Sequence, residues 1–311
     1  MSAETIMVTG AAGLIGRRVL EMLRAGGRRT VGVDITKKND ASADILIADV
    51  ADTHRLHSIV GSEQVGAIVH CGAVSGPMVM IDNPYGIVQA NIVGTANMLE
   101  LARIHRMRRI VFCSSNSAYG PMQERPVDAP AVAEDVVLRP SSVYAATKVA
   151  GELLLAAYKK QHGVDGIAIR LSWVYGPGRT TDCFIRTLIE DAQAGRTTRI
   201  AWGKNFPRQF IHVDDAARAL LAALDADGAK STVYNATGGT FLTLNEIAQL
   251  VASIHGNADI ELADGSDPLD DYQHRLDISA IGQDLGFVPQ ISLEDGIRSY
   301  SGWLKLNSHQ K

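Results

Sequence analysis

Thr9-Gly-Ala-Ala-Gly-Leu-Ile-Gly16 is a glycine-rich stretch that joins a short apolar run, Thr5–Thr9, to an amphipathic one, Leu14–Ala25. A strand that passes into a helix through such glycines lets the backbone approach a pyrophosphate closely, because side chains there would hold the amides away. The N-terminus of the helix adds a partial positive charge. The stretch therefore predicts a dinucleotide site at Gly10, Gly13, Leu14, Ile15 and Gly16.

Short apolar runs and helical segments alternate over the first half of the chain. Strands are expected at Thr30–Asp34, Ile45–Ile47, Ala67–His70, Arg109–Cys113 and Gly166–Leu171, with helices at 53–60, 84–107 and 143–162. Near-continuous apolar strands between helices are typical of a parallel sheet buried on both faces. The pattern predicts an α/β fold: a Rossmann-type doubly wound parallel sheet with a smaller, interleaved C-terminal substrate lobe. We expect the dinucleotide-binding domain at 1–172, with 208–225 returning to it, and the substrate lobe mostly at 173–311.

Composition narrows the functional classes. The 311 residues carry a formal net charge of -4, which gives no basis for a nucleic-acid partner. The chain has no apolar run near the roughly 18 residues that a membrane span needs, and the first strand begins too early for a signal peptide. Cys71, Cys113 and Cys183 show no metal-ligand spacing. We expect a cytoplasmic protein with no membrane partner, reduced core thiols and no metal.

Carboxylates follow the second and third predicted strands. Asp34 closes the second strand, where it can accept hydrogen bonds from an adenosine ribose and would repel a 2′-phosphate, so NAD is the expected cofactor. NADP remains the alternative cofactor, because four cations lie close to this site in the sequence: Arg17, Arg18, Lys37 and Lys38. Asp49 and Val50 follow the third strand, where they are expected to meet the adenine.

Tyr144 and Lys148 are the expected proton-transfer pair. They are four residues apart and share one face of a helix. Tyrosine is a poor base near neutrality, but a fixed positive charge nearby favours the phenolate. Tyr144 could then take the proton of a substrate hydroxyl while hydride leaves for a nicotinamide. Ser115, after an apolar strand, could hold the substrate oxygen; a turn-forming serine is the alternative.

With these residues assembled, the chain resembles the extended short-chain dehydrogenase/reductase family, in its NAD-dependent epimerase/dehydratase group. The match runs from Ile6 to Trp303 and includes Thr9–Gly16, Asp34, Asp49-Val50, His70–Ala73, Asn91–Thr95, Ser114–Gly120, Tyr144–Lys148, Arg170–Pro177 and Arg208–Asp215. The resemblance implies that Ser115, Tyr144 and Lys148 are the catalytic triad. It also implies that Gly72, Ala73 and Asn91 surround the cofactor or support its pocket, and that the protein is a homodimer through helices near 94–106 and 145–161.

Three departures from the family pattern bear on the reaction. Asn116 and Ser117 stand where related dehydratases carry an Asp-Glu pair, and Trp173 stands where nucleotide-sugar epimerases commonly have asparagine. Asp267-Pro-Leu-Asp270 replaces an Arg-Pro-Gly-Asp run, so a carboxylate stands in place of an arginine that would pair with a diphosphate, unless Arg275 substitutes for it.

These departures favour an NAD-dependent oxidoreductase acting on a carbinol of a sugar, sugar acid or polyol, with Tyr144 as acid/base. The alternative is an NAD-dependent nucleotide-sugar 4-epimerase, and a non-catalytic NAD-binding protein is a third hypothesis. Substrate-binding residues are expected among Ser75, Ser115, Asn116, Trp173, Arg179 and Arg208, with His212 a further candidate.

Overall fold

The computed structural model describes residues 4–37, 45–126, 128–179, 181–256, 258–268 and 270–307. A parallel sheet of seven strands lies at its centre in the order β11-β6-β5-β4-β1-β2-β3. The strands are β1 (Thr5–Thr9), β2 (Thr30–Asp34), β3 (Ile45–Ile47), β4 (Val65–His70), β5 (Arg109–Ser115), β6 (Gly166–Leu171) and β11 (Val233–Ala236). Strand order reverses between β1 and β4, and open α/β sheets bind ligands beside such a switch point.

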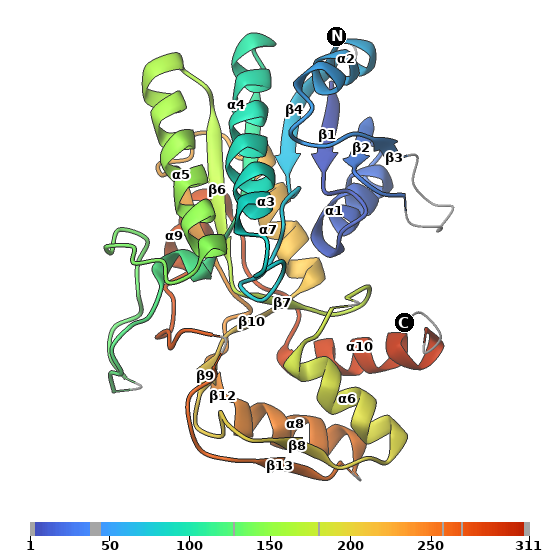
Figure 1. Ribbon diagram of the computed structural model, residues 1–311, viewed down its shortest axis with the longest axis vertical. Helices are drawn as coiled ribbons and strands as arrows, with labels where there is room; N and C mark the ends of the chain where they lie inside the picture. Colours follow the sequence, from blue (N-terminus) through green and yellow to red (C-terminus); the bar gives the residue numbers. More distant parts are fainter. Residues whose placement is uncertain are drawn as a thin grey trace.

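Helices cover both faces of this sheet (Figure 1). On one face, α1 (Leu14–Ala25), α7 (Val213–Asp225) and α9 (Ser279–Leu285) share a buried apolar cluster with the strands. On the other face, α2 (Thr53–Glu63), α4 (Gly94–Ile104) and α5 (Val143–His162) pack in a second cluster. The α/β, doubly wound prediction is confirmed.

A smaller lobe lies beyond the carboxyl ends of the strands, toward which the arrows of β1 and β4 point (Figure 1). Its core is built on α6 (Phe184–Ala194), α8 (Leu244–His255) and α10 (Leu293–Leu306). Three short strand pairs complete it: β7 (Trp173–Tyr175) with β10 (Phe210–His212), β9 (Pro207–Arg208) with β12 (Leu242–Thr243), and β8 (Thr198–Ile200) with β13 (Ile260–Leu262). The chain passes between the sheet and this lobe more than once, because α7 and β11 pack with the seven-stranded sheet. The expected domain boundary at residue 172 stays a prediction.

The helix expected over 84–107 is divided. It consists of α3 (Pro84–Val88), a π-helix at Gln89–Val93 and α4. The hydroxyl of Thr95 donates to the carbonyl of Asn91 at 2.6 Å. A side chain that bonds to a helical carbonyl competes with the backbone ladder and can bend the helix, and this bond lies where the π-helix meets α4.

Candidate active site

The β1–α1 turn requires its glycines. Gly10 has φ +66°, and a Cβ atom at Gly16 would lie 2.2 Å from the carbonyl oxygen of Gly10. Gly13 is the N-cap of α1 and supplies no side-chain cap, so the first-turn amides keep their capacity to bind an anion. The turn therefore has the form of a cradle for a pyrophosphate.

Asp34 lies at the end of β2, directly against this turn. One of its carboxylate oxygens accepts the amide of Ala12 at 3.0 Å and the other accepts the amide of Thr36 at 3.1 Å. Arg18 donates from Nε to Asp214 at 2.7 Å, on the start of α7, and Arg17 lies 4.0 Å from Glu21. Lys38 lies outside the described residues. Arg18 is therefore paired with α7, and the β2 group that bonds to the turn is the Asp34 carboxylate.

The segments after β3 and β4 adjoin the same turn. The Asp49 carboxylate accepts the amide of Ala51 at 2.9 Å, and Val50 packs so closely on α4 that a Cβ atom at Gly94 would lie 2.6 Å from it. The Gly72 amide donates to the hydroxyl of Thr9 at 3.1 Å. The bond to Thr9 holds the loop after β4 beside the glycine turn, and Val50 lies against that loop, since a Cβ atom at Gly72 would be 3.1 Å from it.

Asn91, on the π-helix, binds the loop after β4 at both ends of its carboxamide. Its oxygen accepts the amide of Val74 at 2.8 Å, and its nitrogen donates to the Val74 carbonyl at 3.0 Å. The same nitrogen donates to the Thr147 hydroxyl at 2.9 Å. Asn91 therefore joins the loop that follows Ala73 to the turn of α5 that carries Tyr144 and Lys148.

Ser115, Tyr144 and Lys148 are buried at the carboxyl end of the sheet. Tyr144 lies in the first turn of α5, where the Ser142 hydroxyl caps the helix by accepting the Ala145 amide at 3.2 Å. The Lys148 ammonium donates to the carbonyl of Cys113 at 2.7 Å and lies 5.7 Å from the centroid of the Tyr144 ring. β5 thus fixes the cation on the same helix face as the phenol.

The Ser115 hydroxyl ends β5 and caps the short helix that follows it. It accepts the amide of Ser117 and lies 3.1 Å from the Ser117 hydroxyl. Both contacts are local, so the hydroxyl can turn toward a substrate oxygen without breaking the fold.

A buried ion pair lies behind these groups. Glu152, on α5, pairs with Arg170 of β6 and accepts a hydrogen bond from the hydroxyl of Ser114 at 2.5 Å. The Arg170 guanidinium also donates to the Glu134 carbonyl and lies 4.7 Å from the Tyr119 ring. Sequence reasoning missed this network. The available signal was a charged residue in the middle of an otherwise apolar strand.

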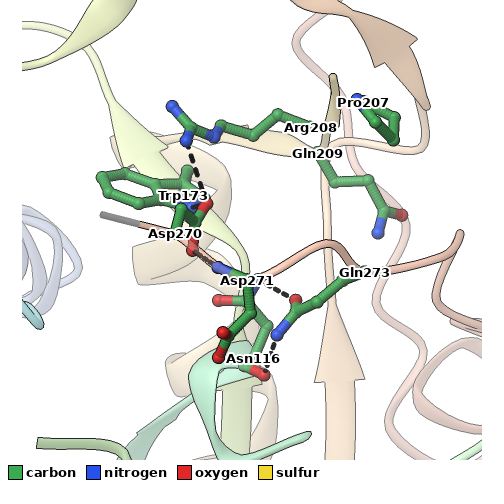
Figure 2. Close-up of a pocket in the computed structure, with 8 residues that line it drawn as sticks. All are labelled: Asn116, Trp173, Pro207, Arg208, Gln209, Asp270, Asp271 and Gln273. Atoms are coloured by element: carbon green, nitrogen blue, oxygen red, sulfur yellow. Dashed lines mark hydrogen bonds and ion pairs between the residues drawn. The ribbon is translucent and has the colours of Figure 1, made fainter. Parts of the chain in front are cut away.

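A second group of residues surrounds a small cavity at Asn116, the residue that follows Ser115 in the chain (Figure 2). Its volume is about 10 Å³, and it is lined by Asn116, Trp173, Pro207, Arg208, Gln209, Asp270, Asp271 and Gln273. Asn116 and Gln273 exchange two hydrogen bonds, of 2.6 and 2.8 Å. Three expected substrate residues, Asn116, Trp173 and Arg208, therefore come together. Asp271 and Gln273 were not anticipated, because their segment has no periodicity.

The other expected substrate residues lie apart from this cavity. Ser75 is exposed in the loop after β4. The Arg179 guanidinium donates to the carbonyls of Val174 and Asp182. Arg275 is exposed and accepts the Val132 amide through its carbonyl. His212 caps α7 by accepting the Asp214 amide at 3.2 Å, and burial lowers its pKa. These contacts give Arg179 and His212 partners within the fold.

Within the described residues, no cluster of three or more metal-ligating side chains occurs. In the same part of the chain, no helix has the length and apolarity that crossing a membrane would require.

The doubly wound sheet, the glycine cradle and the Tyr144–Lys148 helix together define a dinucleotide-binding enzyme of the short-chain dehydrogenase/reductase class. A sequence profile of the NAD dependent epimerase/dehydratase family matches residues 6–237. The chain belongs to this family, as its motifs predicted, and it is an NAD-dependent enzyme of the extended type.

Curated relatives match nearly the whole chain. It is 30% identical to a dTDP-glucose 4,6-dehydratase of Streptomyces niveus over 97% of this chain and 93% of the relative. It is also 30% identical to a UDP-glucuronate 4-epimerase of Thermodesulfobacterium geofontis, over 97% of this chain and 96% of the relative. Among solved structures, it is similar to UDP-glucuronic acid 4-epimerase of Bacillus cereus in complex with UDP-glucuronic acid and NAD. The TM-score is 0.82 and the identity is 25%, and the match covers 97% of this chain and 99% of that structure's chain.

Proposed function

We propose that the protein transfers a hydride between a carbinol carbon of a sugar, sugar acid or polyol and NAD, with Tyr144 as the acid/base. The observation that carries this proposal is the buried pair on α5: the Lys148 ammonium, held by the Cys113 carbonyl, lies beside the Tyr144 ring at the carboxyl edge of the sheet. Ser115 ends the strand that faces this pair.

The glycine turn and Asp34 fit the dinucleotide. The amides after Gly13 would bind the pyrophosphate, Asp34 would bind the adenosine ribose, and the segments at Asp49, Val50, Gly72 and Ala73 would border the adenosine and nicotinamide halves. The turn fits such a group because a Cβ atom at Gly16 would lie 2.2 Å from the Gly10 carbonyl oxygen, so only glycine lets α1 begin this close to the turn.

Each catalytic residue has one task in the oxidation. Bound NAD supplies the acceptor for the hydride. The Lys148 ammonium favours the phenolate form of Tyr144, and this phenolate takes the proton of the substrate hydroxyl to become the neutral phenol. The Ser115 hydroxyl turns from Ser117 to donate to the substrate oxygen. In the reverse reaction, Tyr144 returns the proton.

A second candidate is a nucleotide-sugar 4-epimerase, in which the same hydride returns to the opposite face of the carbon. It is supported by the 30% identity to a UDP-glucuronate 4-epimerase. Dehydration is disfavoured, although a dehydratase is equally similar, because Asn116 and Ser117 cannot protonate a leaving group as carboxylic acids do.

We also propose a cytoplasmic homodimer that pairs through α4 and α5. Leu153 on α5 is 65% exposed and Ile104 on α4 is 49% exposed, so a helical face with apolar side chains is open for a second copy. Cys71, Cys113 and Cys183 are free thiols, which supports a reducing compartment. Light scattering tests this dimer interface by comparing the molar masses of wild type and Leu153→Glu. Equal masses for the two proteins would refute an interface through α4 and α5.

Reduced-nicotinamide absorbance tests the reaction. Free sugars, polyols, sugar acids and nucleotide sugars are each supplied with NAD, and products are analysed for epimers. Tyr144→Phe should lower kcat by about 10²–10⁴-fold, the usual contribution of acid–base catalysis, with NAD affinity retained. Tyr158→Phe, on the same helix, is the matched control and should keep full activity. Full turnover by Tyr144→Phe would overturn the mechanism, and conversion of a nucleotide sugar without net NAD reduction would select the epimerase.

A further inference from the structure

Arg208 projects toward the cavity beside Asn116, but its charge is already neutralised. The guanidinium pairs with Asp267 and, at 3.0 Å, with Asp270. Its planar group lies 4.5 Å from the Trp173 ring, and the Trp173 indole donates to Asp270 at 2.9 Å (Figure 2). The arginine is therefore held between an aromatic face and two carboxylates.

Three carboxylates, of Asp267, Asp270 and Asp271, lie at the side of the cavity that holds the single cation of Arg208. Asp270 and Asp271 line the cavity, and Asp267 is buried against the same Arg208. Burial raises the pKa of Asp270, and the positive charge of Arg208 opposes that rise. An anionic ligand that reached Arg208 would have to displace a buried ion-pair partner and approach two further carboxylates, and both steps cost free energy.

The remaining lining offers hydrogen bonds without net positive charge. Asn116 and Gln273 present carboxamides, and Trp173 presents an aromatic face. Carboxamides and carboxylates bond to hydroxyl groups, and an aromatic face packs on C–H surface. Since Asn116 follows Ser115, this wall meets the part of a substrate that extends from the reacting carbinol.

The cavity also has little room. Its volume of about 10 Å³ is that of one water molecule, whereas pockets for drug-sized ligands have about 300–1,000 Å³. Any organic ligand, a free sugar included, could enter only if lining side chains moved, so the volume does not separate the ligand classes. The charges do, because the carboxylates of Asp267 and Asp270 hold Arg208 in an ion pair.

We propose that Asp267, with Asp270 as the second ion-pair partner of Arg208, is a specificity-determining residue that excludes diphosphate and carboxylate ligands from this arginine, so that the substrate is a small, uncharged, hydroxyl-rich compound such as a free sugar or polyol. This proposal rests on the proposed hydride transfer and narrows its substrate class. It places sugar acids and nucleotide sugars outside the preferred range.

Calorimetry on the NAD-saturated protein tests the exclusion with UDP as the probe. Asp267→Asn should bind UDP about tenfold more tightly than wild type, because one repelling charge at short range is removed. Asp270→Asn is a second variant with the same expectation, and thermal melts establish that each is folded. Asp264→Asn is the matched control: it removes an exposed carboxylate that bonds to Asn205, outside the cavity. Equal UDP affinity in wild type and both variants, or tight binding by wild type, would overturn the proposal.

A kinetic comparison separates this proposal from the proposed function. A free sugar, the acid of the same carbon skeleton and a UDP-sugar are assayed with wild type, Asp267→Asn and Tyr144→Phe. Tyr144-dependent turnover with the highest kcat/KM for the free sugar supports both proposals. Tyr144-dependent turnover that is fastest on the acid or the UDP-sugar would refute the substrate class and leave hydride transfer intact. Turnover that survives Tyr144→Phe would refute the proposed function itself.

Discussion

Arg170 Nη2 lies 2.7 Å from Glu152 Oε2, and each side chain is 4% exposed, so β6 and α5 are joined by a fully buried ion pair. Removal of one partner leaves an uncompensated charge in the interior. Glu152→Gln should lower the free energy of unfolding by about 3–5 kcal/mol, measured by urea denaturation. Glu294→Gln, which breaks the exposed pair with Arg298, should cost no more than about 1 kcal/mol. Similar losses for the two variants would contradict the assignment.

Gly16→Ala should abolish or strongly weaken NAD binding. The added Cβ atom would meet the Gly10 carbonyl at 2.2 Å, so the turn must open and its amides must shift. Gly302→Ala in α10 is the matched control, because nothing lies within 4 Å of its Cβ position. Calorimetric titration with NAD compares the two. An unchanged Kd in Gly16→Ala would show that the turn does not bind the pyrophosphate.

Asp34→Asn should reduce the preference for NAD over NADP by about tenfold, because the carboxylate that repels a 2′-phosphate is neutralised at short range. The asparagine oxygen can still accept the amide of Ala12. The ratio of kcat/KM for the two cofactors measures the effect. An unchanged ratio would assign the cofactor preference to other residues.

His70 predicts an acid-dependent loss of stability. Its ring bonds to the hydroxyls of Thr9 at 2.7 Å and Thr95 at 3.2 Å, and burial, with a smaller contribution from the Lys148 charge, lowers its pKa to about 3. Between about pH 6.5, the unfolded value, and pH 3, the unfolded chain binds a proton that the folded protein does not. The free energy of unfolding should therefore fall with decreasing pH by about 1.4 kcal/mol per unit from this group, and not above pH 6.5.

Urea denaturation as a function of pH checks this slope. His70→Gln should lose this contribution, whereas His54→Gln, on an exposed position of α2, should retain it. His212 has a lowered pKa as well and contributes equally to all three proteins. Parallel pH profiles for wild type and His70→Gln would refute the assignment.

The sequence was most informative where a local pattern specifies geometry. The glycines of the β1–α1 turn, the apolar strands and the four-residue spacing of Tyr144 and Lys148 each depend on neighbours along the chain, and their positions followed from it. The partners of Arg208 could not be predicted, because Asp267 and Asp270 lie in an irregular segment about sixty residues away. The backbone contacts of Arg179 likewise depend on how the chain turns after β7.

The widened turn at Gln89–Val93 makes the length of this segment as important as its composition. A π-turn holds about one residue more than an α-turn, so the helices on its two sides are out of phase by about 100°. Deleting a residue here other than Asn91 would restore regular winding and rotate Asn91 away from Val74 and Thr147, although all three of these residues would remain. Insertions and deletions between α3 and α4 should therefore be far more harmful than conservative replacements.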